Sequence, residues 1–197
     1  MAKTIQFWFE FASTYSYLSA MRIEAAAQAK DISVEWHPFL LGPIFADQGW
    51  RNSPFNIYPA KGRYMWRDME RLCAARGLPF VRPDPFPQNS LNAARLALAI
   101  EDHMERAVFV RAIYSAEFGA GQDISDKSVL AACLKAAGLS TSVMNRAQDP
   151  DVKKALFEQS ARARELGLFG APSFLAREEL FWGDDRLDDA IDYALAI

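Results

Sequence analysis

The sequence predicts an α/β protein whose strands lie at the two ends of the chain and whose middle is helical. Two observations support this class. Residues 1–40 and 168–197 each combine short apolar runs of strand length with one amphipathic stretch. In residues 41–167, apolar side chains recur every three or four positions, which is the spacing of helices. We expect β-α-β, a large all-helical insertion and then β-β-α, with the two ends forming one domain and 41–167 a helical lobe.

The first unit begins with an aromatic and β-branched run over 5–9, which is typical of a buried strand. Ser13 carries a side-chain oxygen suited to capping the helix that we expect over 14–29. A second strand is expected over 32–37, and Pro38 should end it. A unit of this length is usually a right-handed parallel crossover.

Glycines and prolines between 42 and 62 predict a long irregular connection. A helix should follow over 64–76 and stop before Gly77, and a proline-rich extended segment should span 79–87. Further helical stripes are expected over 93–104, 109–116 and 152–166.

The last unit returns to strands. Residues 173–176 and 179–182 are strand candidates around a charged turn, and 186–196 should close the chain as a helix.

The composition argues against several classes of binding partner. A net charge of -3 with scattered Lys and Arg offers no basic surface for nucleic acid. The chain begins without a signal-peptide pattern and holds no apolar run of about 18 residues, so we expect a cytoplasmic protein without membrane contact. Cys73 and Cys133 are the only cysteines and form no CxxC. We expect both in the core, with no disulfide and no metal site.

The run Gly170-Ala171-Pro172-Ser173-Phe174 places a proline directly before a predicted strand. Proline cannot donate to a strand ladder, so Pro172 must lie at an edge or in a special turn. A trans proline in a loop and a cis proline are both open, and about 5% of X-Pro bonds in folded proteins are cis.

This order of elements, with Gly-x-Pro leading into the last unit, resembles the DsbA-like branch of the thioredoxin superfamily. Within that branch, Phe9-Glu10-Phe11-Ala12-Ser13-Thr14-Tyr15-Ser16-Tyr17-Leu18 resembles the opening motif of 2-hydroxychromene-2-carboxylate isomerases and kappa-class glutathione transferases. Asn52 through Lys61, Lys61-Gly62-Arg63-Tyr64, Gln88-Asn89-Ser90 and Gly183-Asp184-Asp185-Arg186-Leu187 follow in the family's order. The resemblance covers essentially the full length.

The resemblance implies a catalytic role for Ser13. In disulfide oxidoreductases of this fold, the first cysteine of CxxC starts helix one, where unpaired N–H groups stabilise a thiolate. A serine cannot perform redox chemistry, but its hydroxyl can donate a hydrogen bond to the thiolate of bound glutathione. The alternative is that Ser13 only caps the helix, and one residue can do both.

The resemblance also implies a set of glutathione contacts. Ala171, before Pro172, would offer its main-chain N–H and C=O to the cysteinyl unit, as in strand addition. Asp184 and Asp185 would meet the γ-glutamyl end, and Asn52 and Lys61 the peptide and its glycyl carboxylate. The alternatives are two helix-capping aspartates, a turn-forming asparagine and a solvated lysine.

Two residues depart from the family pattern. Thr14 stands where relatives usually have proline, so the loop before helix one would be less rigid. Asp184 stands where they commonly have a small neutral polar residue, which alters the local charge. Six large aromatic residues could line a substrate pocket or belong to the core: Trp8, Trp36, Phe39, Trp50, Phe86 and Trp182.

These features predict a glutathione-dependent cis-trans isomerase of the 2-hydroxychromene-2-carboxylate type that acts on an aromatic-degradation intermediate. A kappa-like transferase that conjugates small electrophiles would use the same thiolate, and the sequence leaves this alternative open. A non-catalytic thioredoxin-fold binding module is a third possibility. Relatives are often dimers, so we also expect a homodimer.

Overall fold

The computed structural model describes residues 3–196, and its sheet has the strand order β2-β1-β3-β4. The strands are β1 (Lys3–Phe9), β2 (Ile32–Pro38), β3 (Ser173–Ala176) and β4 (Glu179–Trp182). β1 pairs with β2 in parallel and with β3 antiparallel, and β4 completes the sheet antiparallel to β3. The predicted class, an α/β fold with strands at both ends, is confirmed.

Aromatic side chains hold the centre of the sheet together. Phe7 lies opposite Trp36 on one side and Phe174 on the other. Its ring centroid is 5.0 Å from that of Trp36 and 5.5 Å from that of Phe174. All three side chains are fully buried, and each buried aromatic of this size contributes about 2 kcal/mol through removal from water. The sheet and the main core therefore form together.

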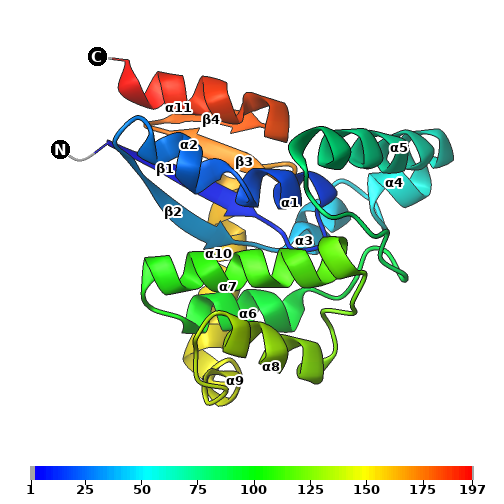
Figure 1. Cartoon of the computed structure of the whole chain (residues 1–197), viewed down its shortest axis with the longest axis vertical. Helices are drawn as coiled ribbons and strands as arrows, with labels where there is room; N and C mark the ends of the chain where they lie inside the picture. The colour runs from blue at the N-terminus through cyan, green and yellow to red at the C-terminus, as the bar shows by residue number, and fades with distance from the viewer. Residues whose placement is uncertain (1–2, 197) are drawn as a thin grey trace.

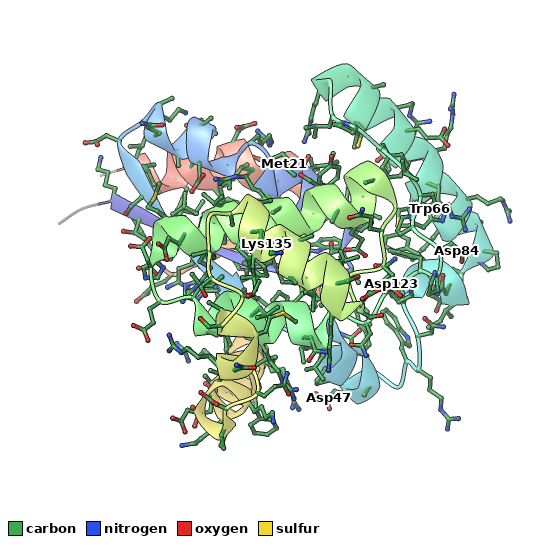
Figure 2. All side chains as sticks on the ribbon, turned by 60° about the horizontal axis from the view of Figure 1, so that its bottom comes forward. Met21, Asp47, Trp66, Asp84, Asp123 and Lys135 are labelled. Carbon is green, nitrogen blue, oxygen red and sulfur yellow. The ribbon has the colours of Figure 1, made fainter. Side chains whose placement is uncertain are left out.

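The single helix expected over 14–29 is two helices, α1 (Thr14–Ala20) and α2 (Ile23–Gln28). The break lies at Met21, labelled in Figure 2, and Arg22, whose φ of -128° and ψ of -17° are not helical. Arg22 uses its guanidinium to bond the Asp184 carbonyl and the Asp188 carboxylate. The bend lets α2 pack against β2 while α1 continues toward the centre of the molecule.

The remaining helices, in chain order, are α3 (Leu41–Asp47), α4 (Pro54–Ile57), α5 (Pro59–Arg76), α6 (Leu91–Ala99), α7 (His103–Tyr114), the π-helix η1 (Ser115–Gly119), α8 (Lys127–Ala136), α9 (Val143–Arg146), α10 (Pro150–Glu165), the 3₁₀ turn η2 (Asp184–Arg186) and α11 (Leu187–Leu195). In Figure 1, α2 and α11 lie above the sheet, α6 to α9 gather below it, and α4 and α5 lie at the right, where α5 contacts α1. No helix among residues 3–196 is long and apolar enough to span a membrane.

The irregular connection expected between 42 and 62 is largely helical. Ser53 caps α4 by accepting a hydrogen bond from the Phe55 N–H, and Pro54 occupies the first turn. Gly62 lies inside α5, where a Cβ atom would stand 2.3 Å from the Phe55 carbonyl oxygen. This glycine permits α4 to pack closely on α5, and its presence was wrongly interpreted as a turn signal.

Other boundaries also differ from the prediction, and α5 begins at Pro59 rather than at residue 64. The stripe expected over 93–104 ends with α6 at Ala99, and Asp102 caps the next helix, α7, by accepting from two main-chain N–H groups. Met104 is consequently 68% exposed and does not belong to the stripe. At the end of the chain, η2 precedes α11, so the last helix begins one residue later than expected.

The proline-rich segment is neither helix nor strand between 78 and 90, as expected. Figure 2 shows it beside α5, near the labelled Trp66 and Asp84. The Trp66 ring lies 4.6 Å from that of Phe86 and 4.7 Å from the Arg82 guanidinium. These contacts fix the segment against the helix.

Cys73 and Cys133 are buried with free thiols, which confirms their place in the core. The division of the chain at 40 and 168 stays a prediction.

A buried ion pair joins the two ends of the chain to α5. Asp184 is 4% exposed, and both of its carboxylate oxygens accept from the Arg76 guanidinium. The Ser19 hydroxyl donates to the same carboxylate at 2.9 Å. Removing one partner of such a pair leaves the other charge buried without compensation.

We therefore expect Asp184→Ala to lower the free energy of unfolding by about 3 kcal/mol, because Arg76 and Ser19 would lose their acceptor. Urea unfolding followed by circular dichroism measures this. The matched control is Asp185→Ala, whose side chain is 75% exposed. Equal stability of the two variants would contradict a structural role for Asp184.

Candidate active site

A large cavity of about 1240 Å³ opens where β1 ends and α1 begins. Its walls come from segments far apart in the sequence. The lining residues that matter below are Glu10, Ser13, Trp50, Asn52, Lys61, Phe86, Gln88, Ser90, Phe169, Gly170, Ala171 and Trp182. Most of the wall is apolar, so the few polar groups in it determine what chemistry is available.

Ser13 stands at the start of α1 on this wall. Its φ of -94° and ψ of 114° are extended, and its side-chain oxygen accepts from the Ser16 N–H, so it caps the helix as predicted. The hydroxyl proton goes to the Ala171 carbonyl oxygen at 2.8 Å. The Ser13 N–H donates to the Glu10 carbonyl at 3.0 Å, which closes a turn between β1 and α1.

The turn before β3 faces Ser13. The Ala171–Pro172 peptide bond is cis, which settles the alternative left open by the sequence. The Gly183 N–H donates to the Pro172 carbonyl at 3.0 Å, and the Ser173 hydroxyl donates to the Gly170 carbonyl at 2.8 Å. The turn is thus held from both sides, and Ala171 is presented to the cavity.

Asn52 and Lys61 reach the same cavity from the segment around α4. Both side chains are exposed. The side-chain oxygen Oδ1 of Asn52 accepts hydrogen bonds from the Ser53 N–H and from the Asn56 side-chain amide. The side-chain NH₂ group of Asn52 is therefore the part available to a ligand. The Lys61 ammonium lies 5.0 Å from the centre of the Tyr58 ring.

Neither aspartate of the predicted set contributes to this wall. The Asp184 carboxylate is buried and bonded to Arg76 and Ser19, which gives it the structural task described above. An aspartate at the start of a helix is found both at ligand sites and in structural ion pairs, and the structure shows the ion pair for Asp184. Asp185 is exposed and lies next to the turn at Gly183.

The six aromatic candidates divide evenly between the cavity wall and the core. Trp50, Phe86 and Trp182 line the cavity. Trp8, Trp36 and Phe39 are buried in the core.

The position of the Trp182 ring depends on the absence of a side chain at Gly170. A Cβ atom on Gly170 would stand 2.4 Å from the indole nitrogen of Trp182, so only glycine lets the ring lie over the backbone there. Trp182 also contacts Phe169, with ring centroids 4.9 Å apart. Together these residues form an aromatic rim on the cavity beside Ala171.

Glu10 is a wall residue to which sequence reasoning gave no role. It is 7% exposed and accepts a hydrogen bond from the Ser90 hydroxyl. Burial raises the pKa of the Glu10 carboxyl to about 7, although the Ser90 hydroxyl and the Ala12 N–H act in the opposite direction. A charged residue between two buried phenylalanines was the available signal in the sequence.

Glu117 lies in η1, has no exposed surface, and neither carboxyl oxygen has a hydrogen-bond partner among residues 3–196. Burial, and then the charge of Glu10, hold the pKa of Glu117 well above its usual range.

Three or more His, Cys, Asp or Glu side chains suited to a metal ion do not come together anywhere in the described part of the chain.

Comparisons with known proteins agree with this fold. Residues 4–195 match the family model described as a DSBA-like thioredoxin domain. A 2-hydroxychromene-2-carboxylate isomerase of Sphingobium xenophagum is 30% identical over 197 residues, which cover 99% of this chain and 100% of the relative. Human glutathione S-transferase kappa 1 is 25% identical over 205 residues, covering 95% and 89%. A solved 2-hydroxychromene-2-carboxylate isomerase superposes with a TM-score of 0.87 at 23% identity, covering 98% of this chain and 94% of that one.

The match of the family model is nearly full length. The chain therefore belongs to the DsbA-like thioredoxin-domain family, in the group of 2-hydroxychromene-2-carboxylate isomerases and kappa-class glutathione transferases, and it is an enzyme of that kind.

Proposed function

We propose that this enzyme is a glutathione-dependent cis-trans isomerase of the 2-hydroxychromene-2-carboxylate type that acts on an aromatic-degradation intermediate. The observation that carries the proposal is the Ser13 hydroxyl, placed in the cavity wall within 2.8 Å of the Ala171 carbonyl. The names of the relatives support both the isomerase activity and the use of glutathione, since they include isomerases and glutathione transferases.

Ser13 would stabilise the thiolate of bound glutathione. A free thiol has a pKa of about 8.5 and is only a few per cent ionised at neutral pH. Lowering that pKa by two units requires about 2.7 kcal/mol. A hydrogen bond to a charged acceptor supplies about 1.5 to 3 kcal/mol, so one hydroxyl provides most of the stabilisation needed.

The Ser13 hydroxyl has one proton, so it cannot donate to the Ala171 carbonyl and to a thiolate at once. When the thiolate binds, the proton turns from Ala171 to sulfur. The Ala171 carbonyl is then released to accept the main-chain N–H of the cysteinyl unit. Glutathione thus replaces the hydrogen bond between the Ser13 hydroxyl and the Ala171 carbonyl.

Two of the remaining contacts come from residues of the cavity wall, and one comes from the exposed Asp185, which lies outside it. Lys61 would pair with the glycyl carboxylate, and the Asn52 amide would donate to the peptide. Asp185 would meet the ammonium of the γ-glutamyl end. We leave Asp184 out of the set because its carboxylate is fully engaged.

In the proposed reaction, the thiolate adds to a conjugated carbon of the substrate and the ring opens. A carbon–carbon bond that has become single then rotates, and elimination returns glutathione together with a trans alkene. Glutathione acts as a catalyst and is not consumed. The aromatic rim at Trp182 would contact the flat substrate.

A kappa-like transferase is the second candidate, favoured by the similarity to human glutathione S-transferase kappa 1. It would use the same thiolate but release a conjugate. A cytoplasmic location, a homodimer and small aromatic or electrophilic substrates stay predictions for either activity. Light scattering measures the mass in solution.

Ser13→Ala should abolish the ultraviolet thiolate absorbance that appears when glutathione is added, and should lower kcat/KM about 100-fold, as for loss of one donor to an anion. The control is Ser16→Ala, since the Ser16 side chain is fully buried and outside the cavity wall. Thiolate absorbance of wild-type size in Ser13→Ala would refute the role of the hydroxyl.

Lys61→Ala should weaken glutathione binding about 5-fold, which corresponds to one exposed ion pair of about 1 kcal/mol. The effect should shrink with added salt, because exposed charges are screened. Isothermal titration calorimetry measures the affinity. Arg63→Ala removes the same charge from the same helix but outside the cavity wall, and it should bind like wild type.

Turnover should leave the amount of free glutathione unchanged. Mass spectrometry after many turnovers of 2-hydroxychromene-2-carboxylate would then find the trans product and intact tripeptide. A stoichiometric glutathione adduct would instead identify the transferase.

A further inference from the structure

Two buried carboxyl groups behind Ser13 have no cation beside them. Within residues 3–196, neither Glu10 nor Glu117 has an ion-pair partner, in contrast to Asp184 with its arginines. An isolated carboxylate is strongly disfavoured away from water. Both groups are therefore held toward the protonated form, in which a carboxyl group can donate a hydrogen bond or a proton.

Only one of the two carboxyl groups can meet a ligand. Glu10 lines the cavity and is 7% exposed, whereas Glu117 is fully enclosed and lies outside the wall. Glu10 is also tied to Ser13, whose N–H donates to the Glu10 carbonyl at 3.0 Å. The residue that would hold the sulfur and this carboxyl group thus belong to the same turn.

The surroundings fix the position of Glu10. Ser90, itself 7% exposed and part of the wall, donates to the carboxyl oxygen Oε1. The Tyr114 hydroxyl, from α7, donates to the Glu10 main-chain carbonyl at 2.9 Å. Ser90 thus holds the carboxyl group, while Tyr114 and Ser13 hold the main chain of Glu10, and together they give the side chain the fixed geometry that proton transfer requires.

We propose that Glu10 is a second catalytic residue, a general acid that protonates the substrate when the glutathione thiolate adds and takes the proton back when it leaves. This inference rests on the proposed function. The substrate class is an α,β-unsaturated carbonyl compound in its cyclic hemiketal form, with its ring oxygen directed to the polar part of the wall at Glu10 and Ser90.

The electron and proton movements balance. Sulfur forms a bond to the conjugated carbon, the carbon–carbon π bond shifts toward the hemiketal carbon, and the bond from that carbon to the ring oxygen breaks. The ring oxygen takes the proton of Glu10 and becomes a phenol, so Glu10 becomes a carboxylate and the opened adduct is an enol. After rotation, the enol proton returns to Glu10, the double bond re-forms, and the carbon–sulfur bond breaks to release the thiolate.

The ionisation of Glu10 fits this cycle. With its pKa raised to about 7 by burial, the Glu10 acid form is available below neutral pH and is lost as the pH rises through 7. The groups that face it are Ser90, which directly precedes α6, Tyr114 from α7 and Glu117 from η1. The thiolate of glutathione, in contrast, forms as the pH rises. Because the reaction needs both the thiolate and the acid form of Glu10, kcat/KM should be bell-shaped in pH.

The test compares wild type, Glu10→Gln and Glu117→Gln, using 2-hydroxychromene-2-carboxylate as substrate. We expect Glu10→Gln to form the glutathione thiolate as wild type does, to lose about 100-fold in kcat/KM, and to lack the decline of kcat/KM above neutral pH. The matched control Glu117→Gln, which changes a carboxyl group outside the wall, should keep both rate and pH profile.

Ser90→Ala is the second variant, and it retains the Glu10 carboxyl if Glu10→Gln fails to fold. Because the Ser90 hydroxyl lowers the pKa of Glu10, its removal should move the alkaline decline to higher pH. A wild-type pH profile in Ser90→Ala, or a wild-type rate in Glu10→Gln, would overturn the assignment. Absence of the thiolate in wild type would instead refute the proposed function, and this inference with it.

Discussion

The antiparallel pairing of β1 with β3 is the constraint on which the site depends. It brings together two segments whose functional residues, Ser13 and Ala171, are 158 positions apart. The register places Trp8 opposite Ser173, so the ends of both strands reach the cavity at the same level. A shift by one residue would turn Phe7 and Phe174 out of the core, which their burial forbids. The core therefore determines the distance between the hydroxyl and the turn.

The buried acidic residues differ in whether a cationic side chain lies beside them. Asp184 is buried with arginines and a serine hydroxyl around it, so it can remain ionised and join three segments of the chain. Glu10 and Glu117 are buried to a similar degree without any cation. The same residue class thus serves stability in one place and carries exchangeable protons in another. Neighbouring residues make the difference.

The sequence predicted the elements that have strong local patterns. The strands of both terminal units and the start of the first helix were predicted correctly, because buried strands and a capping serine leave short, specific signals, and β3 and β4 agree with the expected boundaries. The break at Met21 could not be foreseen, since it serves contacts of Arg22 with Asp184 and Asp188 far along the chain. Gly62 was misjudged for the same reason, because the atom that requires a glycine belongs to another helix.

For the site, Ser13, Ala171, Asn52 and Lys61 could be predicted through the resemblance, and the structure brings all four to one cavity. Asp184 could not be separated from Asp185 by sequence, because their difference is the arginine of α5 that packs against only one of them. Glu10 and Glu117 were missed because burial without a partner is a property of the assembled core. Local patterns report which residues turn inward but not what they meet there.

The contact of Trp182 with the backbone at Gly170 has an evolutionary consequence. The ring occupies the space that any side chain at 170 would need, so the two positions cannot vary independently. A lineage that gains a side chain at 170 must first exchange the tryptophan for a smaller residue, and the mouth of the cavity would widen in the same step. Changes of substrate preference among such enzymes should therefore appear as paired replacements at these two positions.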